Sequence, residues 1–247
     1  MIVLGVETAT MNGGVALAGD EGLIAELRLN VKTTHSERLL PGLDYLLKQT
    51  GLELEQIDIL AVSHGPGSFT GLRVGISLVK GIAFAYGTGK KVVAVPTLEA
   101  FAWHFPFSCL PVCPLLDARR GELYGGIFLW REGEFTRVVP EAALPPDKWI
   151  ELARDALDRG HDKIVLMGEG SAIYGKNFRD SLGGRALFAP PSAMSPSPAN
   201  VALLGVQMAA KGLFADPEML VPFYIRKSEA ELKLKQSHPA GQVSKTG

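Results

Sequence analysis

The chain has 247 residues, of which 47% are hydrophobic and 21% are charged. This composition is typical of a globular protein and too apolar for a disordered one. The length allows one large domain or two lobes with a core that needs neither disulfides nor metals. The net charge is −1 and no Lys/Arg cluster is present, which argues against tight RNA binding by this chain alone.

The cysteines and the first residues bear on the compartment. Only Cys109 and Cys113 are present, which is typical of a protein in a reducing environment. The opening MIVLGVETAT has no basic n-region and no long apolar h-region, and the apolar stretches are too short to span a membrane. We therefore expect a cytoplasmic protein with no membrane contact.

The first half of the chain reads as three strands followed by alternating helices and strands. Hydrophobic patterning predicts strands at 2–7, 13–18, 23–29, 58–64 and 91–95. Thr34 and Glu37 have capping-box spacing ahead of a leucine-rich helix, and two more helices are predicted at 70–86 and from residue 97. The order is βββαβαβα, and strands separated by helices predict parallel pairing.

The second half repeats this order without close sequence identity. Predicted strands are 111–117, 122–130, 134–138, 163–167 and 185–188, and predicted helices are 146–157, 171–181 and 198–211. The duplication resembles the actin/Hsp70-like (ASKHA) ATPase superfold, an α/β fold with two lobes. We expect an N-terminal lobe of residues 1–100 completed by 198–226, a reduced C-terminal lobe of 101–197, and an extension at 227–247 that is disordered at its end.

The segment GPGSFTG, residues 65–71, joins a predicted strand to a helix and has two interpretations. Amides at the start of the helix could hold an anion. Alternatively, the glycines serve a tight turn without a ligand, because they permit positive φ and close approach of another backbone. The segment matches neither G-x-G-x-x-G nor a Walker loop, so the sequence leaves both interpretations open.

Several motifs resemble the bacterial TsaB (YeaZ) family. They are VETATMNGGVAL, HSERLLP, GPGSFTGLRVGIS, TLEAFA, DARRGELY, SPANVALLG and VPFYIRKSEAE, in the family's order over roughly residues 1–230. The resemblance implies a role in synthesis of N6-threonylcarbamoyladenosine at position 37 of tRNA. It also implies that the chain is a scaffold for the catalytic paralogue TsaD, with the ATPase TsaE as a further partner.

The residues at the metal-binding positions of TsaD indicate a supporting role. TsaD holds its metal with two histidines in an H-M-E-G-H helix, where i and i+4 side chains share one face. The matching stretch here places Thr97 and Phe101 at the histidine positions and keeps only Glu99. We therefore expect an accessory subunit with no catalytic or metal-binding residues. The rival interpretations are a small-molecule kinase of the same superfold and, with least support, a metallopeptidase.

Nucleotide-binding relatives place their first phosphate loop where this chain has Glu7-Thr-Ala-Thr10. The weak candidates for a nucleotide site are Glu7, Thr8, Thr10 and Gly67. An aspartate is more usual at the first position, and the second loop carries Arg119 and Arg120 where ATPases have small polar residues. We expect no cofactor that this chain requires alone, with ATP or ADP as a candidate ligand at the partner interface.

The helix at 70–86 has two apolar faces, whereas a helix covering one side of a sheet needs only one. One face includes Ile76, and the other includes Val74, Leu78 and Ala85. The preceding helix contributes Leu39, Leu43 and Leu47. We expect these two helices to pair with TsaD or with a second copy, giving a homodimer in isolation and a heterodimer with TsaD, and to meet tRNA only within the complex. The alternative is that the two helices cover each other within one subunit.

Overall fold

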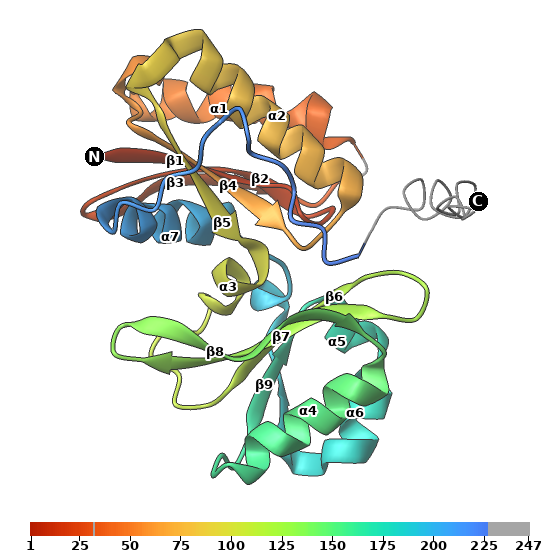
Figure 1. The fold of residues 1–247 in the computed structure, drawn as a ribbon. Helices are drawn as coiled ribbons and strands as arrows, with labels where there is room; N and C mark the ends of the chain where they lie inside the picture. The colour runs from red at the N-terminus through yellow and green to blue at the C-terminus, as the bar shows by residue number, and fades with distance from the viewer. Residues whose placement is uncertain (32, 227–247) are drawn as a thin grey trace, which may run out of the picture.

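A computed structural model describes residues 1–31 and 33–226, which form two lobes, each built on one sheet (Figure 1). The strands of the first lobe are β1 (Ile2–Glu7), β2 (Gly13–Gly19), β3 (Gly22–Leu29), β4 (Ile59–Gly65) and β5 (Lys91–Pro96). Its helices are α1 (His35–Thr50), α2 (Phe69–Tyr86) and α7 (Pro198–Ala210). Its strand order is β3-β2-β1-β4-β5, in which β1, β4 and β5 are parallel and β2 and β3 are antiparallel.

The second lobe repeats this arrangement. Its strands are β6 (Val112–Asp117), β7 (Leu123–Arg131), β8 (Glu134–Leu144), β9 (Ile164–Met167) and β10 (Ala186–Phe188), in the order β10-β9-β6-β7-β8. Its helices are α4 (Pro146–Asp158), α5 (Glu169–Ile173) and α6 (Gly175–Leu182), and α3 (Thr97–Ala102) connects the lobes. One predicted helix is thus two, because the backbone of Tyr174 leaves helical geometry between α5 and α6.

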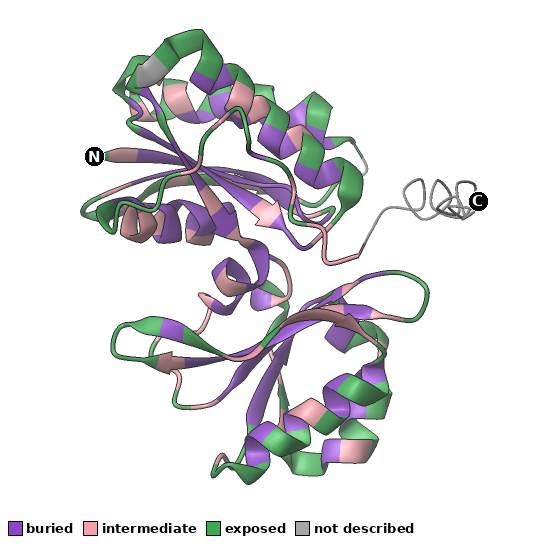
Figure 2. Cartoon of the chain, in the orientation of Figure 1, coloured by how far each residue is buried: buried purple, intermediate pink, exposed green. Residues whose placement is uncertain are grey.

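The first sheet is covered on both faces, by α1 and α2 on one side and by α7 on the other (Figure 1). Successive residues of β1 serve the two sides: Leu4 packs in the cluster with α1 and α2, and Val3 packs in the cluster with α7. This explains why β1 reads as a continuous apolar run rather than an alternating one. Figure 2 shows the result, with the inner strands of the sheets buried and the outer helix faces exposed.

Helix α2 is the one helix among the described residues that is long and apolar enough to cross a membrane by length and composition, with a mean hydropathy of 1.2. Its inner face is a core face, as predicted. Leu72, Ile76 and Val79 are at most 4% exposed. Packing on the sheet therefore accounts for much of its apolar character.

The chain after α7 returns across the first lobe, and we name residues 213–226 the strap. Ala215 forms a β-bridge with Val92 at the outer strand β5, and Leu220 is buried in the core beside α2. Lys80 of α2 donates hydrogen bonds to the carbonyl oxygens of Glu218 and Leu220. One flank of α2 is thus covered by this chain's own C-terminal segment, which the sequence pattern did not predict.

Candidate functional site

A cleft of about 700 Å³ lies between the lobes. Its first wall is the β1–β2 loop and the beginning of α2, and its second wall is the β6–β7 loop with Glu169 of α5. The end of the strap contributes Tyr224 and Arg226. We call it the interlobe cleft. It is a candidate site because loops from both halves of the duplication meet there.

The glycines of residues 65–71 are explained by close backbone packing. A Cβ on Gly65 would lie 2.3 Å from the carbonyl oxygen of Phe223, and one on Gly71 would lie 2.1 Å from that of Thr8. A Cβ on Gly67 would lie 2.6 Å from the Cβ of Ala9, whose carbonyl oxygen accepts a 2.7 Å hydrogen bond from Ser68 N. The structure therefore favours the tight-turn interpretation of this segment, since neighbouring backbone occupies the space that each glycine leaves.

The four nucleotide candidates separate into two groups. Thr10 and Gly67 line the interlobe cleft, whereas Glu7 and Thr8 are completely buried behind it. Glu7 Oε1 accepts a 2.5 Å hydrogen bond from Ala9 N, and Oε2 has no hydrogen-bond partner among the described residues. Burial raises the pKa of Glu7 to about 7, because an ionised carboxylate is disfavoured away from water. The Glu7 side chain is thus enclosed by protein, whereas an acid that orders a metal ion would face the solvent of the cleft.

Two buried side chains of α1 hold the β1–β2 loop. His35 Nε2 donates to the carbonyl oxygen of Thr10 at 2.8 Å, and Arg38 donates to the carbonyl oxygens of Leu29, at 3.0 Å, and Met11. Arg38 also donates to His35 Nδ1 at 2.9 Å. Burial, and then the charge of Arg38, lower the pKa of His35. These residues belong to the HSERLLP motif, which was the available signal, but the motif does not reveal that their partners are main-chain oxygens.

The second wall carries both signs of charge. Arg119 pairs with Asp117 at 3.2 Å, and Asp117 N donates to Glu169 Oε1 at 3.3 Å. Burial raises the pKa of Glu169. Arg119 and Arg120 have left-handed backbones with φ of 63° and 56°, so the loop turns sharply at the cleft mouth. Within residues 1–31 and 33–226, no group of three or more His, Cys, Asp or Glu residues could hold a metal ion.

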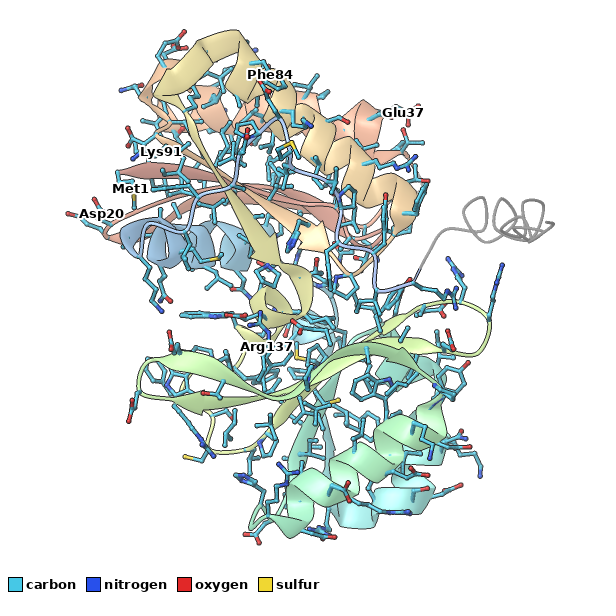
Figure 3. All side chains as sticks on the ribbon, in the orientation of Figure 1. Met1, Asp20, Glu37, Phe84, Lys91 and Arg137 are labelled. Carbon is cyan, nitrogen blue, oxygen red and sulfur yellow. The ribbon has the colours of Figure 1, made fainter. Side chains whose placement is uncertain are left out.

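The positions that match the metal ligands of TsaD have structural roles here. Thr97 is completely buried, and its Oγ1 accepts a 3.1 Å hydrogen bond from Gly65 N. Phe101 is also fully buried, in the cluster beneath α3. Glu99 pairs with Arg137 of β8 at 2.6 Å, and Arg137 lies between the lobes near α3 in Figure 3. This helix face therefore packs between the two sheets.

The predicted partner-binding residues are not all on the surface. Leu39 and Leu43 are each 3% exposed and lie in the core, so they support α1 from beneath and cannot form an outer face. Leu47, Val74 and Leu78 are partly buried against the same core, and Ala85 is exposed. The large apolar side chains that these helices expose are Leu40, Tyr45, Phe69, Phe84 and Tyr86. Of these, Phe69 lines the interlobe cleft. Phe84 lies on the outer side of α2 in Figure 3. The outer face that remains available is therefore formed by Leu40, Tyr45 and Phe84 with Leu47, Val74, Leu78 and Ala85.

Comparisons with known proteins agree with this architecture. The family model described as "TsaD: tRNA N6-adenosine threonylcarbamoyltransferase" matches residues 28–234. TsaB of Bacillus subtilis is 30% identical over 96% of this chain and 99% of its own length. TsaB of Escherichia coli is 29% identical over 95% of this chain and 98% of its own length.

The solved structure described as "YeaZ from Pseudomonas aeruginosa" superposes with a TM-score of 0.76 at 28% identity, covering 90% of this chain and 99% of that one. The duplicated sheets and this likeness confirm the predicted actin-like two-lobed fold. The family resemblance of the sequence motifs is confirmed as well. The chain belongs to the TsaB (YeaZ) family of tRNA threonylcarbamoyladenosine biosynthesis proteins.

Proposed function

We propose that this chain is the non-catalytic scaffold subunit of the complex that makes N6-threonylcarbamoyladenosine at position 37 of tRNA. It binds TsaD and, with TsaD, TsaE. The observation that carries the non-catalytic role is the use of Thr97 and Phe101 in packing, with both side chains fully buried. An accessory subunit can bury these positions, whereas a metal-dependent transferase needs imidazoles that face its substrate.

The docking surface we propose is the outer face of α1 and α2. It presents Leu40, Tyr45 and Phe84, which are 58%, 53% and 56% exposed. Gly81 and Ala85 are exposed between them, and a Cβ on Gly81 would meet nothing within 4 Å, so another helix can approach closely. Two such helix pairs would form a four-helix contact, with a second copy in the isolated protein and with TsaD in the complex.

The chain requires no cofactor alone in this proposal. The β1–β2 loop and residues 65–71 pack on each other, and Glu7 is enclosed. ATP or ADP then binds where TsaD completes the interface. The net charge of −1 supports contact with tRNA only through the complex. The compartment we propose is the cytoplasm, without a membrane contact.

A small-molecule kinase of the same fold is the second candidate, because the interlobe cleft of about 700 Å³ has room for a nucleotide. Thermal unfolding with and without ATP-Mg²⁺ separates the two functions. A kinase would gain roughly 2.7 kcal/mol of stability when ATP-Mg²⁺ is present at about 100 times its Kd. We expect no such gain for the isolated chain.

The deciding experiment is reconstitution with purified TsaD, TsaE, threonylcarbamoyl-AMP and unmodified tRNA. The complete mixture should modify tRNA over many cycles, and omitting this chain should remove most of that activity. The chain alone should produce none. Multiple turnovers by the isolated chain, or full activity without it, would overturn the proposed scaffold role.

A further inference from the structure

The strap ends by crossing from the first lobe to the interlobe cleft. Phe223 N donates to the carbonyl oxygen of His64 at 2.6 Å, beside the close contact at Gly65. Tyr224 then stacks on Phe69 with ring centroids 4.9 Å apart, and its hydroxyl accepts a 3.0 Å hydrogen bond from Arg73 Nε. These contacts fix the strap to the first turn of α2, at one side of the cleft mouth.

The next contacts are on the other lobe. Arg226 Nη1 pairs with Glu122 Oε2 at 2.5 Å, and Nη2 donates to the carbonyl oxygen of Ala118 at 3.1 Å. The side chains of Arg226 and Glu122 are 30% and 31% exposed, so the pair is partly shielded from solvent. A planar guanidinium with two acceptors is held in one orientation, which a single ammonium contact would not achieve.

The strap and α3 join the lobes at different places. Helix α3 packs against both α7 and β6, and the chain is continuous between the lobes through α3 and through residues 189–197. In Figure 1 both α3 and the end of the strap lie at the level between the lobes, and the strap is to the right of α3. Two packed lobes that are joined by short connecting segments can change their separation by hinge rotation, and a tether away from those segments limits that rotation.

We propose that the strap is a latch that sets the opening of the interlobe cleft, and that Arg226 is the residue that binds it to the second lobe. The other end of the latch is anchored on α2, where Lys80 donates to Glu218 O at 3.1 Å and to Leu220 O at 3.4 Å. Whatever displaces the strap from α2 therefore also weakens the hold of Arg226 on the second lobe. Control of the latch by a docked partner would rest on the proposed function, whereas the latch itself is a property of the isolated chain.

The latch is tested by measuring the distance between the lobes. Spin labels at Glu37→Cys on α1 and Lys176→Cys on α6, in a Cys109→Ser background, report one distance per molecule. Cys113 is fully buried and would not be labelled. Labelled protein is diluted with unlabelled protein so that pairs between copies do not contribute. Arg226→Ala and Glu122→Ala should each broaden the distance distribution toward longer values.

Hydrogen exchange at residues 118–122 gives a second measurement. Loss of the partly exposed Arg226–Glu122 pair should make exchange at these residues about two- to five-fold faster, given the usual strength of such pairs. Exchanging the charges with Arg226→Glu and Glu122→Arg should restore the distribution in part, because the hydrogen bond to Ala118 O is not rebuilt. Arg185→Ala is the matched control, since Arg185 pairs with Asp158 at 3.4 Å inside the second lobe.

Transmission along the strap is tested at its far end. Lys80→Ala should lengthen the same distance, by less than Arg226→Ala does. Lys48→Ala, whose exposed pair with Asp44 lies on α1, should leave it unchanged. The proposal is overturned if the distance distribution of Arg226→Ala and Glu122→Ala matches that of the unmodified chain. If only Lys80→Ala is silent, the link to α2 is refuted. Activity of the reconstituted complex is a separate measurement, so loss of the proposed function would be distinguishable from either result.

Discussion

The two lobes repeat one topology but differ in what covers it. In the first lobe α1 and α2 have 16 and 18 residues and leave large apolar side chains exposed. In the second lobe the helix that corresponds to α1 is α4, with 13 residues, and α2 is replaced by α5 and α6, with only 5 and 8 residues. Longer helices with an uncovered outer face offer more surface for packing against another helix pair. We therefore predict that partner recognition is concentrated in the first lobe.

The largest effects should come from the two cores. Ile76→Asp places a charge in the first-lobe core, where Ile76 is 4% exposed. It should lower the free energy of unfolding by more than about 4 kcal/mol and so unfold the chain. Phe178→Ala in the second lobe removes a fully buried ring and should cost about 3–5 kcal/mol. Urea unfolding followed by fluorescence and circular dichroism checks both. If Phe178→Ala shifts only a second-lobe transition and leaves the stability of the first lobe unchanged, the lobes unfold independently.

Glu7 distinguishes the first lobe by its pH dependence. Burial raises the pKa of Glu7 to about 7 from its ordinary value of 4.5, so the folded chain binds more protons than the unfolded chain between these values. The free energy of unfolding is therefore not reduced by this group at low pH, and it falls as the pH rises from 4.5 through 7. Glu7→Gln should remove that fall and stabilise the chain at pH 8 by about 3 kcal/mol.

Urea midpoints measured from pH 5 to pH 8 test the Glu7 prediction. Glu151→Gln is the matched control, because Glu151 is exposed on α4, where it pairs with Lys148. The unmodified chain and the control should lose stability in parallel, while Glu7→Gln should not. Parallel loss in all three proteins would mean that Glu7 stays ionised in the fold.

Association should be the next largest effect. Phe84→Asp puts a charge on the proposed docking face and should weaken pairing with TsaD and with a second copy by at least about 30-fold, in the range of an interface hot spot. Leu78→Asp should weaken pairing too, at some cost in stability because Leu78 is partly buried. Analytical ultracentrifugation and calorimetric titration with TsaD measure both.

The second lobe supplies the control for the docking variants. Ile173 is 59% exposed on α5, so Ile173→Asp makes the same chemical change outside α1 and α2. It should leave association unchanged. If Ile173→Asp weakens pairing and Phe84→Asp does not, the partner binds the second lobe, and the functional contrast between the lobes is reversed.

The sequence predicted the order of strands and helices because hydrophobic periodicity is local, and the buried faces of β1 and α2 agree with it. It did not predict the strap, whose residues 216–226 have no repeating pattern and are held partly by side chains of α2, Lys80 and Arg73. It also placed Leu39 and Leu43 on a docking face. Both are core residues, because α1 approaches the sheet closely on that side.

For the candidate site, the sequence located the loops but not their burial. Glu7 and Thr8 are adjacent in the sequence to Thr10, yet only Thr10 faces the interlobe cleft. Burial depends on contacts between residues far apart in the chain, such as those that residues 65–71 make with Ala9 and Phe223. No local pattern encodes such contacts, although the glycines themselves indicate that some close approach occurs.

The smallest expected effect concerns the exposed arginines of the second lobe. Arg119 has a side chain that is 85% exposed and is already paired with Asp117, so its field is largely neutralised and screened. We expect the free chain to bind tRNA weakly, with a shallow dependence on salt. Arg119→Ala should change the slope of log K against log salt by less than the loss of about one phosphate contact would. Fluorescence anisotropy with labelled tRNA from 50 to 200 mM salt measures this. Submicromolar binding by the free chain at physiological salt, lost in Arg119→Ala, would instead place an RNA contact on the second lobe and contradict the proposal that tRNA is met only through the complex.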